Sequence, residues 1–291
     1  MARDKFYIDE IPDTHEVARF MRENTDWVQM MQKVKPRHHH GDILSFQLHD
    51  FDHTGLAACV DECIEIYGDH GWKSAKGESI AYTGFSLVYN PNHQEGLDPH
   101  SSTLGSRFND RDQFFYESTH THKRLKDSYF DGYGFNVPTP ASMHGELGRF
   151  MSRSLRTRVR SRCSIINGFM DDSSGWHRDE PVFVNLRLNI PLRTDSTYFL
   201  QLENQQPIHL DVGHAYTWNT HVSHQVFSSM PSSIKRIHLV LGFSPWWDFI
   251  ESERAWVKNR FYGEKHPFDM LIEGDVFSGI QLDTNKVLNA G

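Results

Sequence analysis

Apolar and polar residues alternate most regularly in the second half of the chain. Short runs rich in β-branched and aromatic residues are separated there by turn-type residues, at 162–169, 182–192, 197–203, 206–212, 214–219, 224–229 and 236–243. Strands of this length at this spacing are typical of an all-β sandwich or small barrel. We therefore expect residues 160–247 to form a β core.

The rest of the chain predicts elements that flank this core. Helical periodicity or an aromatic pattern predicts helices at 14–34, 53–67 and 145–158 and in the tail 248–291, and a strand at 81–90. Residues 91–145 are polar with weak periodicity, which predicts a long loop. Because long ordered loops often form binding surfaces, we expect this loop to close a functional site.

The strand at 182–192 has two unlike faces. Alternation places Asn185, Arg187 and Asn189 on one face and only apolar side chains on the other. A polar face of this kind is either solvated, as in many antiparallel sheets, or lines a wet cavity. In the second case, the preceding His177 and Asp179 lie at the rim of that cavity.

Length and composition describe an ordinary folded protein. The 291 residues are 38% hydrophobic and 23% charged, which excludes disorder as the main state and predicts one domain in three parts, 1–159, 160–247 and 248–291. The sequence lacks an apolar run long enough to span a membrane and the apolar core of a signal peptide, so we expect a soluble, cytoplasmic protein. The three cysteines are expected to be reduced packing residues.

The net charge of −8 disfavours nucleic acid and gives no reason to expect an anionic membrane as a partner. One basic stretch, 153–162, runs against this trend. Its arginines are either the solvated face of a strand or helix, or, with Phe114, Phe115 and Tyr116, a nucleic-acid surface.

Among 19 histidines, His177 has the most informative setting. It forms a His-x-Asp pair with Asp179 just before a strand, and either His221 or His224 can supply a third ligand downstream. Two imidazoles and one carboxylate bind ferrous iron on one face and leave three positions open. The tripeptide alone is a weak signal, but the order of His-x-Asp, distant His and then Arg236 is more specific.

These segments, WHRDE, GHAYTWNTHVSHQVF and SIKRIHLVLGF, resemble the core of Fe(II)/2-oxoglutarate-dependent oxygenases. The likeness is greatest to their aspartyl/asparaginyl β-hydroxylase-like branch and covers residues 160–247. It implies a mainly β chain with flanking helices around a double-stranded β-helix, or jelly-roll, core. It also implies Fe(II) held by His177, Asp179 and His224, with 2-oxoglutarate and O2 as co-substrates. His224 is preferred to His221 because it starts a strand and lies twelve residues before Arg236.

The resemblance also implies roles for other side chains. Arg236 would grip the distal carboxylate of 2-oxoglutarate, since a guanidinium binds a carboxylate through two parallel hydrogen bonds. The further candidates are His238, Ser164 and Asn167 for the cofactor, and Arg187, Asn185 and Trp176 for the substrate. Because the carboxylate ligand Asp179 is present, hydroxylation is favoured over halogenation.

The implied substrate is an amino-acid-like small molecule or a peptide side chain, attacked at an unactivated carbon with release of succinate and CO2. Two alternatives remain open at this point. One is a non-catalytic or zinc-binding jelly roll, because a fold does not fix a function. The other is a nucleic-acid-modifying oxygenase that uses the basic stretch 153–162.

Overall fold

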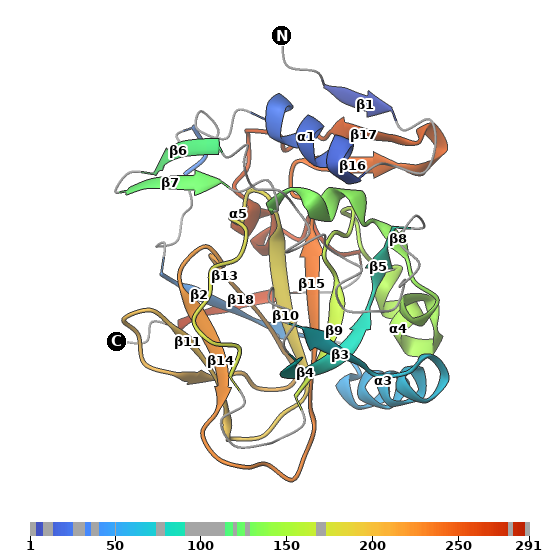
Figure 1. Ribbon diagram of the computed structural model, residues 1–291, viewed down its shortest axis with the longest axis vertical. Coiled ribbons are helices and arrows are strands. Elements are labelled where there is room, and N and C mark those ends of the chain that lie inside the picture. The colour runs from blue at the N-terminus through green and yellow to red at the C-terminus, as the bar shows by residue number, and fades with distance from the viewer. Residues whose placement is uncertain are drawn as a thin grey trace.

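A large antiparallel sheet forms the body of the molecule (Figure 1). The computed structural model describes residues 4–7, 14–25, 33–35, 41–49, 51–73, 79–90, 114–118, 121–125, 129–166, 173–278 and 282–288. The strands of the large sheet, in spatial order, are β18 (Leu282–Leu288), β2 (Ile43–Leu48), β13 (His214–Trp218), β10 (Leu186–Arg193), β15 (Arg236–Phe243), β9 (Arg162–Ile166), β4 (Ser79–Ser86) and β3 (His70–Lys73).

A second, small sheet lies against one face of the large one. It consists of β12 (Ile208–His209), β11 (Tyr198–Leu202) and β14 (His224–Ser228), and residues 173–177 extend it through two bridges to β14. Tyr82 of β4 donates a hydrogen bond to the Val226 carbonyl of β14 and packs beside Tyr198, so the two sheets enclose a common interior. The chain therefore has the double-stranded β-helix core, mainly β with flanking helices, that the sequence predicts.

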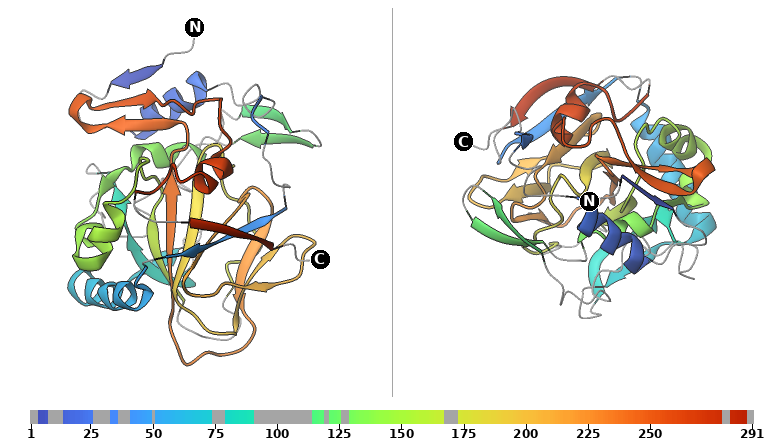
Figure 2. Two further views of the ribbon diagram at one scale, coloured as in Figure 1. Left: turned by 180° about the vertical axis from the view of Figure 1, so that it is seen from behind. Right: turned by 90° about the horizontal axis from the view of Figure 1, so that it is seen from above.

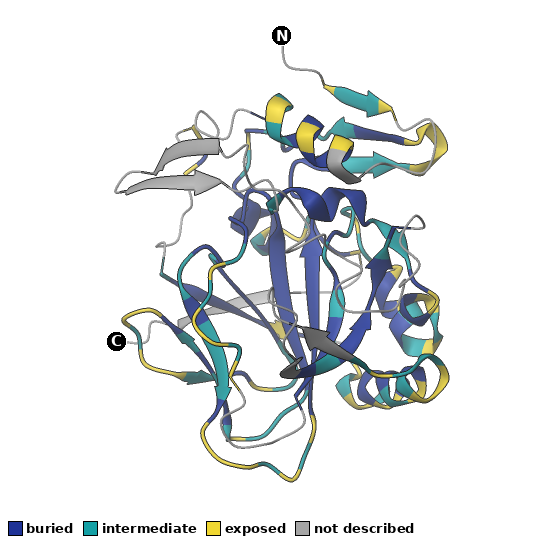
Figure 3. Cartoon of the chain, viewed as in Figure 1, coloured by how far each residue is buried: buried dark blue, intermediate teal, exposed yellow. Residues whose placement is uncertain are grey.

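The central strands β10 and β15 of the large sheet are buried (Figure 3), and their two faces differ in chemistry. On β15, Ile237, Leu239 and Leu241 belong to the main apolar core, which also includes side chains of α3 (His53–Tyr67) and α4 (Gly145–Met151). The alternate residues of the same strand, among them Arg236 and His238, face the interior between the sheets. The polar face predicted on 182–192 is likewise buried, because every residue of β10 except Arg193 is shielded from solvent.

The predicted helices at both ends need correction. The helix expected at 14–34 is observed as α1 (Thr14–Asn24), with 26–32 outside the described residues, and the helix expected at 145–158 ends at Met151. In its described part, the tail forms the strands β16 (Trp247–Ile250), β17 (Ala255–Lys258) and β18, and a single short α-helix, α5 (Pro267–Ile272).

The tail prediction was wrong at 246–258 because tertiary packing outweighs the local pattern there. Trp247 and Trp256 are both fully buried, and Arg254, with a φ of 47°, lies in the turn between their strands. β1 (Lys5–Tyr7) pairs with β17, so the N-terminal strand and the β16–β17 hairpin form a small sheet at one end of the molecule, whereas β18 joins the large sheet (Figures 1 and 2).

The predicted loop at 91–145 contains regular structure in its described part. Its elements are β6 (Phe114–Ser118), β7 (Thr121–Leu125), β8 (Val137–Pro138), which pairs with β5 (Val88–Tyr89), and two 3-10 turns, η4 (Asp131–Gly134) and η5 (Ala141–Met143). Residues 91–113 lie outside the described part, so closure of the site by this loop stays a prediction. The three cysteines are free and buried, as expected. Within the described ranges, no helix combines the length and apolar character needed to span a membrane.

Candidate metal centre

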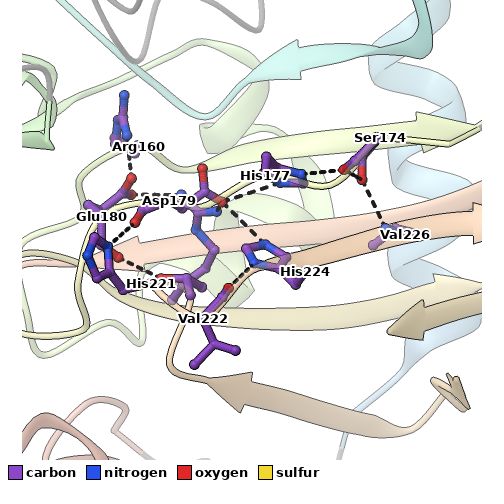
Figure 4. A network of polar contacts seen from close by, with 12 residues as sticks. Arg160, Ser174, His177, Asp179, Glu180, His221, Val222, His224 and Val226 are labelled. Atoms are coloured by element: carbon purple, nitrogen blue, oxygen red, sulfur yellow. Dashed lines mark hydrogen bonds and ion pairs between the residues drawn. The ribbon is translucent and has the colours of Figure 1, made fainter. Parts of the chain in front are cut away.

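Three predicted ligands come together at the edge of the small sheet (Figure 4). His177 and His224 form a backbone bridge with hydrogen bonds of 3.0 and 2.9 Å in the two directions. The Asp179 amide donates to the carbonyl of Thr220, which brings the carboxylate beside the two imidazoles. One donor atom from each of the three side chains lies within 4.8 Å of the other two.

Backbone carbonyls orient both imidazoles toward the carboxylate. The Nδ1 atoms of His177 and His224 lie 2.8 and 2.9 Å from the carbonyl oxygens of Gly175 and Val222. An Nδ1–H that donates to a carbonyl leaves the Nε2 lone pair for a metal. The two Nε2 atoms lie 3.8 and 3.6 Å from Oδ2 of Asp179. Burial lowers the pKa of His177 and so favours its neutral, ligating form.

His221, the alternative ligand, is held differently. Its Nδ1 lies 2.9 Å from the backbone carbonyl oxygen of Asp179, and its ring packs edge-on against Tyr129. His221 therefore contacts the main chain of the site, whereas His224 reaches the Asp179 carboxylate. The geometry thus brings His224 and not His221 together with the other two predicted ligands.

Asp179 belongs to a buried ion-pair network. One guanidinium nitrogen of Arg187 donates a hydrogen bond to Oδ2 of Asp179, and a second donates to Glu180 at 2.7 Å. Arg160 donates to the other side of Glu180 at 2.5 Å and lies 3.3 Å from Asp131. Burial opposes ionisation of Asp179, but Arg187 and then His224 hold its pKa well below the usual range.

Arg187 is thus bound to two carboxylates of the protein itself. Its side chain is only 5% exposed, and its predicted grip on a substrate carboxylate stays a prediction. Asn185, also predicted for the substrate, donates to Glu180 within the same network. Trp176 projects to solvent with 51% of its surface exposed, a position at the outer rim of the centre.

A second polar pair lies on the inner face of β15. Arg236 donates through Nη2 to Nδ1 of His238 at 2.9 Å, and its guanidinium faces the Tyr198 ring at 5.7 Å. Because arginine has no acceptor, Nδ1 of His238 must accept and Nε2 must carry the proton. Burial, followed by the charge of Arg236, holds the pKa of His238 well below its ordinary value.

This pair leaves strong donors without partners. Nε of Arg236 and Nε2 of His238 are buried and have no hydrogen-bond partner within the described part of the chain. No described carboxylate forms an ion pair with Arg236, and burial lowers its pKa to about 10. A buried cation without an anion is unfavourable, so the arrangement suits an anionic ligand.

Of the two remaining cofactor candidates, the structure describes one. Ser164 is buried on β9 directly opposite His238, within reach of the same ligand region. Asn167 lies outside the described residues. The amide of Asn189, on the same inner face of the sheet, has a buried nitrogen without a hydrogen-bond partner among the described residues.

The basic stretch 153–162 is mostly absorbed into the fold. Arg156 pairs with Asp248 at 2.7 Å, Arg160 joins the buried network, and only Arg153 of the arginines is exposed. Every arginine of the stretch except Arg153 is partly shielded from solvent, so the stretch does not form the solvated face that the sequence offered as one alternative. The side chains of β6 lie outside what the structure describes, so the aromatic part of the nucleic-acid hypothesis stays a prediction.

Sequence reasoning missed Glu180 and Arg160. Glu180 follows the His-x-Asp motif directly, which was a usable signal, but a glutamate after a turn is ordinarily exposed. Its complete burial depends on Arg160, which is twenty residues away, and on Arg187 of the next strand. Such a pairing becomes visible only when the strands are assembled.

Comparisons with known proteins give a distant likeness. No family model matches the sequence, and no curated protein matches it. A solved prolyl hydroxylase in complex with a hypoxia inducible factor oxygen degradation domain peptide fragment from Trichoplax adhaerens is 11% identical, with a TM-score of 0.37 over 83% of this chain and 92% of that chain. An oxidoreductase of the 2OG-Fe(II) oxygenase family from Burkholderia pseudomallei is 13% identical, with a TM-score of 0.34 over 82% of this chain and 93% of that chain. Likeness at this level assigns neither family nor activity.

Proposed function

We propose that this chain is an Fe(II)- and 2-oxoglutarate-dependent dioxygenase that hydroxylates a carbon of an amino-acid-like molecule or a peptide side chain. The observation that carries the proposal is the pairing of two features inside one barrel. A His/Asp/His cluster has both Nε2 atoms facing a carboxylate, and Arg236 with His238 presents buried donors that lack an acceptor among the described residues.

The cluster fits ferrous iron by its donor set. Two neutral imidazoles and one carboxylate on one side of an ion leave adjacent positions for a chelating co-substrate and a gas. His177, Asp179 and His224 would hold the ion. Backbone carbonyls fix the two rings, and Arg187 fixes the carboxylate, so little reorganisation is required when the ion binds.

The Arg236–His238 pair fits the far carboxylate of 2-oxoglutarate. Arg236 and His238 present nitrogen donors on the same face of β15, and Ser164 lies opposite His238. A carboxylate offers acceptors to several such donors at once. The ligand would also neutralise the buried charge of Arg236, which no described residue does.

When bound, Fe(II) supplies redox chemistry that couples O2 and the decarboxylation of 2-oxoglutarate to hydroxylation of a C–H bond, with succinate and CO2 as co-products. The protein's own residues provide position and a dry environment. Trp218 packs edge-on against the His224 ring at 5.6 Å, and Tyr198, with Tyr82 and Val226, covers the interior near Arg236. Such apolar walls exclude water from the reacting groups.

The substrate class is inferred from likeness to other proteins and not from contacts in the site. The resemblance of the sequence to the aspartyl/asparaginyl β-hydroxylase-like branch favours amino-acid-like substrates, and the Trichoplax neighbour was solved with a peptide. The carboxylate ligand favours hydroxylation over halogenation. A cytoplasmic location, predicted from the composition, is part of the same proposal.

The test is anaerobic reconstitution of the purified chain with Fe(II) and 2-oxoglutarate, followed by visible absorption. We expect a metal-to-ligand charge-transfer band in the wild type and in His221→Ala, and none in His177→Ala or His224→Ala. On exposure to O2, the wild type is expected to form succinate, and amino acids and peptides that increase this rate are candidate substrates.

The alternative of a zinc-binding or non-catalytic jelly roll predicts a different result. It requires that no band form in any sample and that metal analysis of the isolated chain find zinc or no metal. A band that persists in both histidine variants would also contradict the proposed ligands.

A further inference from the structure

A second group of metal-type ligands lies on the outside of the barrel, where α3 meets the start of α4. Cys59 and Glu62 are one turn apart on α3, and His144 immediately precedes α4. One donor atom from each of the three lies within 4.8 Å of the others. We propose that Cys59, Glu62 and His144 form a zinc site that fastens α3 to α4, separate from the His/Asp/His centre.

The donor set suits zinc. Thiolate, imidazole and carboxylate are its three common protein ligands, and three of them with one water complete a tetrahedron. At ordinary zinc bond lengths, the ligand atoms of a tetrahedron lie roughly 3.3–3.8 Å apart. Nε2 of His144 already lies 3.3 Å from Oε2 of Glu62, so a small movement of the side chains brings the set to that spacing.

The surroundings leave room beside the sulfur. The Cys59 side chain lies against the turn before α4, with Sγ 3.5 Å from the His144 carbonyl oxygen. Gly145, at φ +47°, follows, and a Cβ added there would lie only 3.2 Å from Sγ. A glycine at this position therefore keeps the space next to the thiol open, and the Tyr67 ring packs edge-on against the His144 ring.

The three proposed zinc ligands differ in their exposure to solvent. Cys59 is 4% exposed, whereas the side chains of His144 and Glu62 are 30% and 62% exposed, so an ion can enter from solvent. Cys63, one turn further along α3, is fully buried, and its Sγ donates a hydrogen bond to the Ala141 carbonyl oxygen at 3.7 Å. Cys63 therefore stays a packing thiol and provides a matched control.

Cobalt(II) distinguishes the two centres, because only the proposed site contains sulfur. The full-length chain is reduced, stripped of metal and titrated with Co(II) under nitrogen. A near-ultraviolet thiolate-to-cobalt charge-transfer band is expected in the wild type, in Cys63→Ala and in His177→Ala. It is expected to vanish in Cys59→Ala, to weaken strongly in His144→Ala and to be displaced by Zn(II).

Thermal unfolding supplies a second measurement. Because a ligand of the folded state raises its stability, Zn(II) should raise the Tm of His177→Ala but not that of the double variant His177→Ala/His144→Ala. His144 is partly exposed, so its loss leaves the fold intact where Cys59→Ala could fail. Absence of a thiolate band at excess Co(II), its survival in Cys59→Ala, or an equal zinc effect on both Tm values would overturn the site. None of these outcomes depends on the proposed oxygenase activity.

Discussion

The two faces of the large sheet are buried to a similar degree but contain opposite chemistry. Ile237, Leu239 and Leu241 of β15 are fully buried in the apolar core under the helices. On the other face of the strand, Arg236 and His238 are almost as buried, yet they have donors without partners in the described structure. An unsatisfied buried donor costs about 1–3 kcal/mol. In the proposed function, these two neighbouring donors face the position of the co-substrate carboxylate.

The same contrast separates buried from exposed ion pairs. Glu180→Ala removes the carboxylate between Arg160 and Arg187, so each of these buried cations keeps only one carboxylate partner, Asp131 and Asp179 respectively. We expect the free energy of unfolding to fall by about 3–5 kcal/mol, measured by urea denaturation. The control is Glu203→Ala, whose partner Arg178 is exposed, with an expected change of about 0–1 kcal/mol. Equal losses in the two variants would contradict the structural role of the network.

The outer face should respond as an ordinary core. Leu239→Ala removes a fully buried side chain and should lower the free energy of unfolding by about 2–5 kcal/mol. The folded fraction of this variant should bind 2-oxoglutarate with the wild-type affinity, because Leu239 points away from the space between the two sheets. A selective loss of 2-oxoglutarate binding, measured well below the unfolding temperature, would show that the two faces are not independent.

His221 tests which histidine is the ligand. Its ring contacts the main chain of Asp179, so His221→Ala should cost about 0.5–1.5 kcal/mol of stability and leave one Fe(II) bound per chain. His224→Ala should instead abolish Fe(II) binding. Metal content after anaerobic gel filtration distinguishes the two variants. If His221→Ala lost Fe(II) and His224→Ala kept it, His221 would be the ligand.

The smallest expected change in stability is at Arg236. Arg236→Met replaces an unpaired buried cation by an apolar side chain of similar length, so the Tm should stay constant or rise. Thermal scans without 2-oxoglutarate measure this directly. A marked drop in Tm would mean that Arg236 serves the fold and not a ligand.

How far the sequence predicts this molecule depends on whether the relevant contacts are local. Alternation at 182–192 predicted that β10 has two unlike faces, and it left open whether the polar face is solvated or lines a cavity. The structure shows that this polar face is buried between the two sheets. His177 and Asp179 are two residues apart, so the sequence alone predicted that they lie close together. Arg160, a partner of Glu180, lies twenty residues before it, and the hairpin containing Trp247 and Trp256 packs against β1 and α1, so local periodicity does not contain these contacts.

The most direct test is calorimetric titration of 2-oxoglutarate into the Fe(II)-loaded chain under nitrogen. The expected result is binding of one 2-oxoglutarate per wild-type chain, equal affinity in the exposed-site control Arg178→Met, and loss of binding in Arg236→Met at unchanged Tm. Equal affinity in Arg236→Met and the wild type, or no binding to the wild type, would contradict the account.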